Sequence, residues 1–260
     1  MIYWEPSPKK MNDSDLTDLP VILEAKQVSL TDSFSLTEIL NGISFQIKKR
    51  DRAAVLGTSG SGKTSLLRLL NRLSEPTTGT LFFQGTSYSQ IPVLSLRKKI
   101  VLVPQEPKLL GMNVREALAY PLTLQKLSKS EIKQRLTTYC EALQIPESWY
   151  NKKELELSFG QRQLVTIARG LIMQPEVLLL DEPTSALDIG IATKVINFLK
   201  RQEMTIIMVN HQLELAEMFC NRLLYLQKGE LTKDQLNLNF NWQELKQEFS
   251  ETEQEWQEID

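Results

Sequence analysis

The most constraining stretch of this 260-residue sequence is a glycine-rich run, Gly57-Thr58-Ser59-Gly60-Ser61-Gly62-Lys63-Thr64. It matches the pattern G-x-x-x-x-G-K-[ST] at every fixed position. Glycines and small hydroxyl residues let the backbone wrap closely around an anion, so that consecutive N–H groups point at its oxygens. The run therefore predicts a loop that holds a chain of phosphates.

The flanking residues predict the strand and helix that this loop requires. Residues 53–56 are apolar and typical of a short buried strand, and leucines recur at helical spacing after the loop: Leu66, Leu67, Leu69, Leu70 and Leu73. A helix that begins near Lys63 would direct its positive end at the anion. Lys63 would then reach the terminal phosphates of a nucleotide, and the Thr64 hydroxyl would bind Mg²⁺. An ordinary Gly/Ser turn is the alternative, but the order of strand, loop and helix argues against it.

Composition is that of a globular protein with a sizeable core, because 42% of the residues are hydrophobic and 24% are charged. A net charge of -2 offers no basic surface, so we expect no nucleic-acid partner. Cys140 and Cys220 lie far apart, which indicates free thiols in a reducing compartment. No apolar run approaches the roughly 18 residues of a membrane span, and the N-terminus lacks a signal-peptide pattern. We therefore expect any membrane role to depend on a partner.

Hydrophobic patterning predicts an α/β fold: a P-loop NTPase core with a mostly parallel sheet, an N-terminal antiparallel β subdomain and an inserted α-helical subdomain. Apolar residues alternate with polar ones around residues 43–47, as in a half-buried antiparallel strand. The runs Ile100–Val103, Val177–Leu180 and Thr205–Val209 are almost wholly apolar, as in a parallel sheet covered on both faces. Residues 106–174 are mostly helical in pattern and form the insert.

The domain boundaries follow from changes in composition. Residues 1–20 are polar and contain proline, so we predict a loose extension before a catalytic domain over 21–230. Residues 231–260 form an acidic tail, in which Trp242, Leu245, Phe249 and Trp256 fall at helix-compatible spacings. The tail is either a solvated acidic helix packed by a few apolar anchors or a regulatory, partner-binding helix.

A pair of acids follows the second apolar strand, in Val177-Leu178-Leu179-Leu180-Asp181-Glu182. Two acids at a strand end are more often a solvated turn than a site. In a sequence that also contains a phosphate-binding loop, a functional site becomes the favoured interpretation. Asp181 is then placed to bind the Mg²⁺ sphere, and Glu182 to orient and deprotonate an attacking water.

The run Leu157-Ser158-Phe159-Gly160-Gln161 precedes a helical pattern, so Ser158 is predicted to cap a helix. Here the sequence resembles the ATP-binding cassette (ABC) family, whose signature is L-S-G-G-Q. Four of the five positions match, and Phe159 replaces the first glycine. Read alone, Ser158 would be only a cap.

Other motifs of the family occur in its order. Gln105 follows the strand Ile100–Val103 and resembles the Q-loop glutamine. The run Ser185-Ala186-Leu187-Asp188 resembles the D-loop, and His211, the single histidine, resembles the H-loop switch. Phe34 resembles the A-loop aromatic that stacks on adenine, although that position is usually tyrosine, and Phe34 could instead be a core residue.

The resemblance implies roles for particular residues. Catalysis would involve Glu182, His211 and Gln105; Mg²⁺ would contact Thr64, Gln105 and Asp181; and ATP would contact Phe34, residues 57–64, Ser158, Gly160, Gln161 and Asp188. In this family the signature of one subunit meets the phosphate-binding loop of another. We therefore expect a head-to-tail dimer, with two copies of this chain as the simplest case.

The expected function is that of an ATP-binding and ATP-hydrolysing subunit that drives transport through separate transmembrane permease subunits. Such a subunit would be cytoplasmic and peripheral on the inner face of the cell membrane. A surface around Leu109, Leu110, Met112 and Tyr120 would receive a helix of the permease, or else belong to the core of the helical lobe. The alternative is a soluble ABC ATPase of the iron–sulfur-cluster-assembly type, with no transport role.

Overall fold

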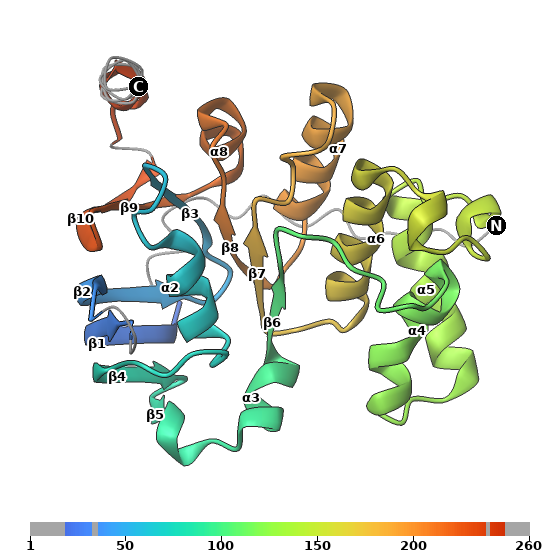
Figure 1. Cartoon of the computed structure of the whole chain (residues 1–260), viewed down its shortest axis with the longest axis horizontal. Coiled ribbons are helices and arrows are strands. Elements are labelled where there is room, and N and C mark those ends of the chain that lie inside the picture. Colours follow the sequence, from blue (N-terminus) through green and yellow to red (C-terminus); the bar gives the residue numbers. More distant parts are fainter. Residues whose placement is uncertain (1–18, 33–35, 238–239, 248–260) are drawn as a thin grey trace.

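The structure is a computed structural model that describes residues 19–32, 36–237 and 240–247 (Figure 1). Its strands are β1 (Val21–Thr31), β2 (Glu38–Lys48), β3 (Arg52–Gly57), β4 (Thr78–Phe83), β5 (Thr86–Ser87), β6 (Ile100–Val103), β7 (Val177–Asp181), β8 (Thr205–Val209), β9 (Arg222–Gln227) and β10 (Glu230–Leu236). Its α-helices are α2 (Lys63–Leu70), α3 (Val93–Lys99), α4 (Val114–Leu124), α5 (Lys129–Ala142), α6 (Phe159–Ile172), α7 (Ile189–Lys200) and α8 (Leu213–Phe219). Short 3₁₀ turns occupy Tyr88–Gln90, Glu147–Trp149 and Glu154–Glu156.

An antiparallel sheet in the order β2-β1-β4-β5 forms the N-terminal β subdomain. Ala25 of β1 pairs with Phe45 of β2 on one side and with Leu81 of β4 on the other. The alternating side chains of β2 at positions 43, 45 and 47 are all buried, as their pattern predicted. This sheet lies beside α2 (Figure 1).

The second sheet has the order β10-β9-β3-β8-β7-β6. Its strands are parallel except for β10, which pairs antiparallel with β9 at one edge. Every residue of β7 and β8 is buried, which explains why these runs lack polar alternation. The predicted α/β fold with a mostly parallel sheet, an antiparallel subdomain and a helical insert is confirmed.

Two hydrophobic clusters lie on opposite faces of this second sheet. On β3, Ala54 and Leu56 belong to one cluster, whereas Ala53 and Val55 belong to the other, because successive side chains of a strand point to opposite faces. The first cluster also contains the helical insert, α4 to α6, and the second contains α2 and the antiparallel sheet. Both cysteines are buried free thiols, as predicted.

The C-terminal region differs from its prediction as a tail from residue 231. Residues 230–236 form β10, and Leu245 is fully buried against the same cluster as the helical insert. Lys246 Nζ lies 3.1 Å from a carboxylate oxygen of Glu217 on α8. The sequence of β10 is polar because this strand is an exposed edge, so it carried no apolar strand signal. Phe249, Trp256 and nearly all of the expected extension at 1–20 lie outside the described residues.

Candidate functional site

The phosphate-binding loop connects the end of β3 at Gly57 to the start of α2 at Lys63. A Cβ on Gly57 would stand 2.1 Å from the carbonyl oxygen of Leu226 on β9. A Cβ on Gly62, which caps α2 in a left-handed conformation with φ 97°, would stand 2.6 Å from the side chain of Leu40. Close packing against the carbonyl oxygens of Leu226 and Ile39 therefore requires glycine at these two positions, independently of any ligand.

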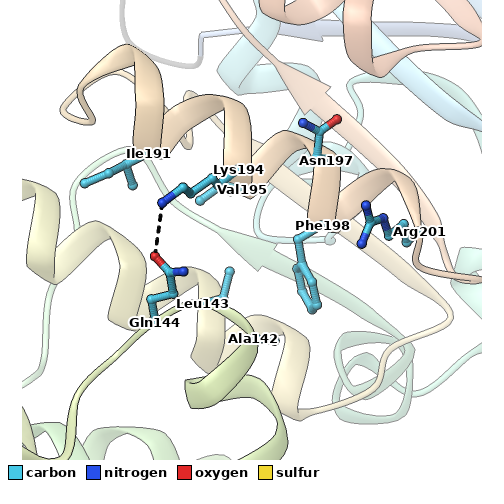
Figure 2. Close-up of a pocket in the computed structure, with 9 residues that line it drawn as sticks. All are labelled: Ala142, Leu143, Gln144, Ile191, Lys194, Val195, Asn197, Phe198 and Arg201. Atoms are coloured by element: carbon cyan, nitrogen blue, oxygen red, sulfur yellow. Dashed lines mark hydrogen bonds between the residues drawn. The ribbon is translucent and has the colours of Figure 1, made fainter. Parts of the chain in front are cut away.

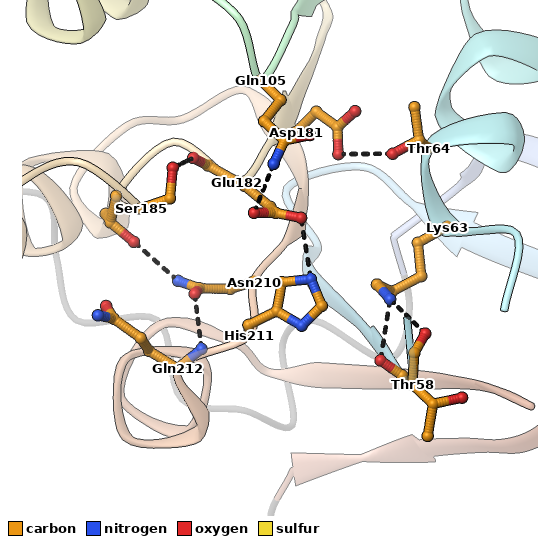
Figure 3. A network of polar contacts seen from close by, with 12 residues as sticks. Thr58, Lys63, Thr64, Gln105, Asp181, Glu182, Ser185, Asn210, His211 and Gln212 are labelled. Carbon is orange, nitrogen blue, oxygen red and sulfur yellow. Dashed lines mark hydrogen bonds and ion pairs between the residues drawn. The ribbon is translucent and has the colours of Figure 1, made fainter. Parts of the chain in front are cut away.

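The Lys63 side chain folds back over this loop. Its Nζ donates to the carbonyl oxygens of Gly57 at 2.9 Å and Thr58 at 2.7 Å (Figure 3). Burial lowers the pKa of Lys63, while the carboxylates of Glu182 and Asp181 act in the opposite direction. The loop thus holds a partly desolvated ammonium group, which an anionic ligand would stabilise.

A buried hydroxyl in the loop fits the same kind of ligand. Ser61 Oγ is buried and has no hydrogen-bond partner within the described part of the chain. Buried polar groups are rarely left unpaired, and a phosphate oxygen would accept from this hydroxyl. The Cβ position of Gly60, by contrast, faces open space. The residues of the loop therefore fit a phosphate chain.

Thr64 and Asp181, two of the residues expected to bind Mg²⁺, are in contact. Thr64 Oγ1 donates to Asp181 Oδ1 at 3.2 Å, across from α2 to the end of β7 (Figure 3). Burial raises the pKa of Asp181, so a cation bound beside it would favour the ionised form. The described residues contain no group of three or more His, Cys, Asp or Glu that could hold a metal. Mg²⁺ would thus take few oxygens from the protein and the rest from phosphates and water, as it does in many phosphate sites.

Glu182 lies between Gln105 and His211. Its Oε2 accepts from Gln105 Nε2 at 2.9 Å, and its Oε1 lies 2.9 Å from His211 Nε2 (Figure 3). The three residues follow β6, β7 and β8, and the carboxyl ends of these parallel strands meet at one edge of the sheet. The structure therefore brings together three of the residues singled out from the sequence.

The signature run forms the start of α6. Ser158 Oγ accepts from the Gln161 N–H at 3.2 Å and Gln161 Oε1 accepts from the Ser158 N–H at 3.0 Å, which makes a reciprocal capping box. A Cβ on Gly160 would stand 2.7 Å from the Ala186 carbonyl oxygen, so α6 approaches the loop after Glu182 closely. The Phe159 side chain is partly exposed, with its ring 5.3 Å from the Arg162 guanidinium carbon.

The signature residues lie apart from the phosphate-binding loop of their own chain. In Figure 1, α2 and α6 lie on either side of β6 and β7. Asp188 caps α7 by accepting from the Ile191 N–H at 3.1 Å, so within the chain it has a structural role. Phe34 lies outside the described residues.

Two polar residues of the network did not emerge from the sequence patterns. Asn210 donates from Nδ2 to Thr184 Oγ1 at 3.1 Å and accepts at Oδ1 from the Gln212 N–H at 2.9 Å (Figure 3). Gln163 is 2% exposed and contacts the segment after β7. A signal was present for Gln163, because a glutamine on the apolar face of a helix needs buried hydrogen-bond partners.

A pocket of about 380 Å³ lies elsewhere, between the end of α5 and α7 (Figure 2). Leu143 and Phe198 contribute apolar surface, and Lys194 Nζ donates to Gln144 Oε1 at 3.4 Å across it. The lining includes none of the residues predicted for nucleotide or metal, so this pocket is separate from the network around Glu182.

Comparison with curated proteins finds relatives among bacterial import subunits. The "Methionine import ATP-binding protein MetN" of Francisella tularensis subsp. holarctica is 36% identical over 203 residues, which is 75% of this chain and 58% of the relative. "MetN 1" of Staphylococcus aureus is 36% identical over 222 residues, or 82% of this chain and 65% of the relative. The chain thus spans about three fifths of the length of these relatives.

Solved structures give a similar result. A structure described as the dimer of a bacterial ABC transporter cassette superposes with a TM-score of 0.78 at 28% identity, covering 84% of this chain and 100% of the other. CbiO1 of Clostridium perfringens, part of the CbiONQ transporter complex, gives 0.74 at 29% identity, with 84% and 89% covered. In the described part of the chain, no helix has the length and apolar character of a membrane span. The family model described as "ABC transporter" matches residues 40–185, more than half of the sequence, and the chain therefore belongs to the ABC transporter family.

Proposed function

We propose that this chain is an ATP-binding and ATP-hydrolysing subunit that dimerises around ATP and drives transport through separate membrane subunits. The observation that carries this proposal is the position of Glu182. Its carboxylate is held by Gln105 and His211 at the sheet edge where Lys63 and Asp181 also lie (Figure 3). A general base next to a phosphate-binding loop is the arrangement that hydrolysis of a terminal phosphate requires.

ATP would bind with its phosphates along the loop 57–64. Lys63 would exchange its contacts with the two backbone carbonyls for the terminal phosphates, and the Ser61 hydroxyl would gain its missing acceptor. Thr64 and Asp181 would hold Mg²⁺, which supplies positive charge against the phosphate oxygens when bound. Gln105, whose amide nitrogen donates to Glu182, would join the metal sphere through its side-chain oxygen.

Glu182 would orient a water molecule and take its proton as the water attacks. The carboxylate is fixed at both oxygens, which reduces the reorganisation needed to reach a reactive geometry. His211 would hold Oε1 and contact the departing phosphate. Because the His211 side chain is partly exposed, it can respond to what occupies the site.

Completion of the site would come from a second copy. Ser158, Gly160 and Gln161 stand at the start of α6, where backbone N–H groups and a hydroxyl can meet an anion on another molecule. They lie away from the loop of their own chain (Figure 1). A head-to-tail homodimer would bring each signature run to the ATP of its partner, and Asp188 would lie near the same boundary. One of the similar solved structures is described as dimeric.

Fewer of the four residues considered for a permease surface are exposed than the sequence indicated. Leu109 is fully buried and Met112 partly buried in the helical lobe, so both belong to its core. Leu110 and Tyr120 are 66% and 47% exposed and stay available for a partner. The names of the relatives, which describe import subunits, favour transport over iron–sulfur-cluster assembly. The subunit would then sit on the inner face of the membrane.

Two measurements test this proposal: ATP hydrolysis by the purified protein and identification of the proteins that bind it. Purified protein is expected to release phosphate from ATP in the presence of Mg²⁺, and affinity purification in detergent is expected to recover multi-span membrane proteins. Absence of ATP hydrolysis, alone and with the recovered partners, would refute the enzymatic part. Recovery of soluble scaffold proteins in place of membrane proteins would favour the cluster-assembly alternative.

A further inference from the structure

The main chain of Glu182 adopts a conformation that is unusual for a residue with a side chain. Its φ is 48°, in the left-handed region that glycine occupies readily and other residues seldom do. Such a conformation persists where surrounding contacts fix it. The Glu182 N–H donates to the Val209 carbonyl at 3.1 Å, which fixes one side of the residue against β8.

The other side of Glu182 is held by Gln163 of α6. Gln163 Nε2 donates to the Glu182 carbonyl oxygen at 2.8 Å, and Gln163 Oε1 accepts from the Ala186 N–H at 3.1 Å. One amide therefore closes both ends of the turn 182–186. Only this orientation of the amide satisfies both contacts, because the reverse would set donor against donor and acceptor against acceptor.

Burial makes these contacts hard to replace. Gln163 is 2% exposed, so water has little access to either hydrogen bond. Ser185 also donates to the Glu182 carbonyl, from Oγ at 3.1 Å and from its N–H at 3.3 Å, but Ser185 is exposed, so water competes with these contacts and weakens them. Gln163 is thus the buried element that holds the left-handed main chain of Glu182.

We propose that Gln163 is a positioning residue, which sets the direction of the Glu182 carboxylate by holding its main chain. This inference rests on the proposed function of Glu182 as the base. The direction in which a side chain leaves the backbone depends on φ and ψ, so release of the carbonyl would let the carboxylate move away from Gln105 and His211. The side-chain hydrogen bonds of Gln163 go to Glu182, Ser185 and Ala186, none of which belongs to the loop 57–64 or to the residues expected to hold Mg²⁺.

The same contact links the signature run to the base. Gln163 lies on α6 five residues after Ser158, and Gly160 of the same helix abuts the Ala186 carbonyl. A movement at the start of α6, such as engagement by a second copy, would therefore reach both ends of the turn 182–186. In this arrangement the rate of the chemical step depends on the position of α6, while ATP binding to the loop does not.

The test compares Gln163→Met with Thr166→Val. Methionine keeps the length of glutamine and removes the hydrogen bonds to Glu182, Ser185 and Ala186. Thr166→Val removes a different buried polar group of α6, a hydroxyl. This hydroxyl donates to the Gln163 carbonyl at 2.9 Å and not to the turn 182–186. Gln163→Met is expected to lower kcat for ATP by about 10²-fold, the scale of a small misplacement of a reacting group, and to leave KM within about twofold. Thr166→Val is expected to keep kcat within about twofold.

Hydrogen exchange at the Ala186 amide gives a readout that does not depend on turnover. In Gln163→Met this amide loses its acceptor and is expected to exchange at least about tenfold faster, with no change in Thr166→Val. An unchanged kcat in Gln163→Met would overturn the proposal, whether or not exchange accelerates. If the wild-type protein fails to hydrolyse ATP, the proposed function is wrong, and unchanged exchange would separately show that Gln163 does not hold the turn.

A second variant covers the case in which Gln163→Met does not fold. Ser185→Ala removes the other side-chain donor to the Glu182 carbonyl from an exposed position, where loss of folding is not expected. It should lower kcat by about threefold to tenfold, because one ordinary hydrogen bond to the same carbonyl is lost. An undiminished kcat in Ser185→Ala would show that support of this carbonyl does not control the base.

Discussion

Glu182→Gln tests the central chemical role with the smallest change in structure. Glutamine has the shape of glutamate but cannot take a proton from water at neutral pH. Its oxygen can still accept from Gln105 Nε2, and its amide can pair with the His211 ring, so the two contacts of 2.9 Å survive. ATP binding, which depends on the loop 57–64, should therefore be retained.

The expected magnitude follows from the loss of one general base. Such a group typically contributes about 10² to 10⁴ in rate, or about 2.7 to 5.4 kcal/mol of barrier at about 1.36 kcal/mol per factor of ten. Steady-state phosphate release should fall by that factor. Equilibrium binding of a fluorescent ATP analogue should stay within about threefold of wild type, and size-exclusion chromatography with ATP should show accumulation of a dimer.

Glu106→Gln is the matched control. Glu106 is an exposed acid next to Gln105, and its pair with Lys108 at 3.0 Å is a surface pair of little energetic value. This change should leave phosphate release within about twofold. Wild-type turnover in Glu182→Gln would remove Glu182 as the base, because the variant retains every contact except the proton acceptor.

Three further predictions concern binding and stability. Lys63→Ala should abolish the rise in melting temperature that ATP causes in the wild type, and a retained rise would remove the phosphate-binding role of the loop. Burial raises the pKa of Asp181 above its usual 3.8, so keeping this side chain ionised at neutral pH lowers the free energy of unfolding. Without ligand, Asp181→Asn should therefore have a higher melting temperature than the wild type. The difference in melting temperature should shrink as the pH falls toward 3.8. Leu245→Ala should lower the free energy of unfolding by about 2–5 kcal/mol in urea titration, against about 0.5 kcal/mol or less for the exposed Leu236→Ala, and equal effects would place Leu245 outside the core.

The fold and the position of the site were largely predictable from local sequence. The almost wholly apolar runs at 177–180 and 205–209 became the central strands, because only a sheet covered on both faces buries every residue of a strand. Their carboxyl ends meet at one edge, so Gln105, Glu182 and His211 come together although 106 residues separate the first from the last. The hydrophobic pattern thus predicted the strands, and the place of these strands in the sheet determines where the three residues lie.

The features that the sequence did not predict depend on contacts between distant parts of the chain. β10 is a polar edge strand, and it is ordered by pairing with β9 and not by burial of its own side chains. The role of Gln163 depends on the conformation of Glu182, and no propensity rule assigns a left-handed backbone to a glutamate before proline. Leu109 is buried and Leu110 is exposed because the chain turns at Leu110, which has φ 57°.

The two hydrophobic clusters on opposite faces of the parallel sheet separate two kinds of change during evolution. The helix that carries Lys63 is anchored in one cluster, and the helical lobe that exposes Leu110 and Tyr120 is anchored in the other. Substitutions at sites that lie far apart and share no contacts have nearly additive effects on stability. The exposed surface of the helical lobe can therefore change while the loop 57–64 and the helix that follows it keep their packing.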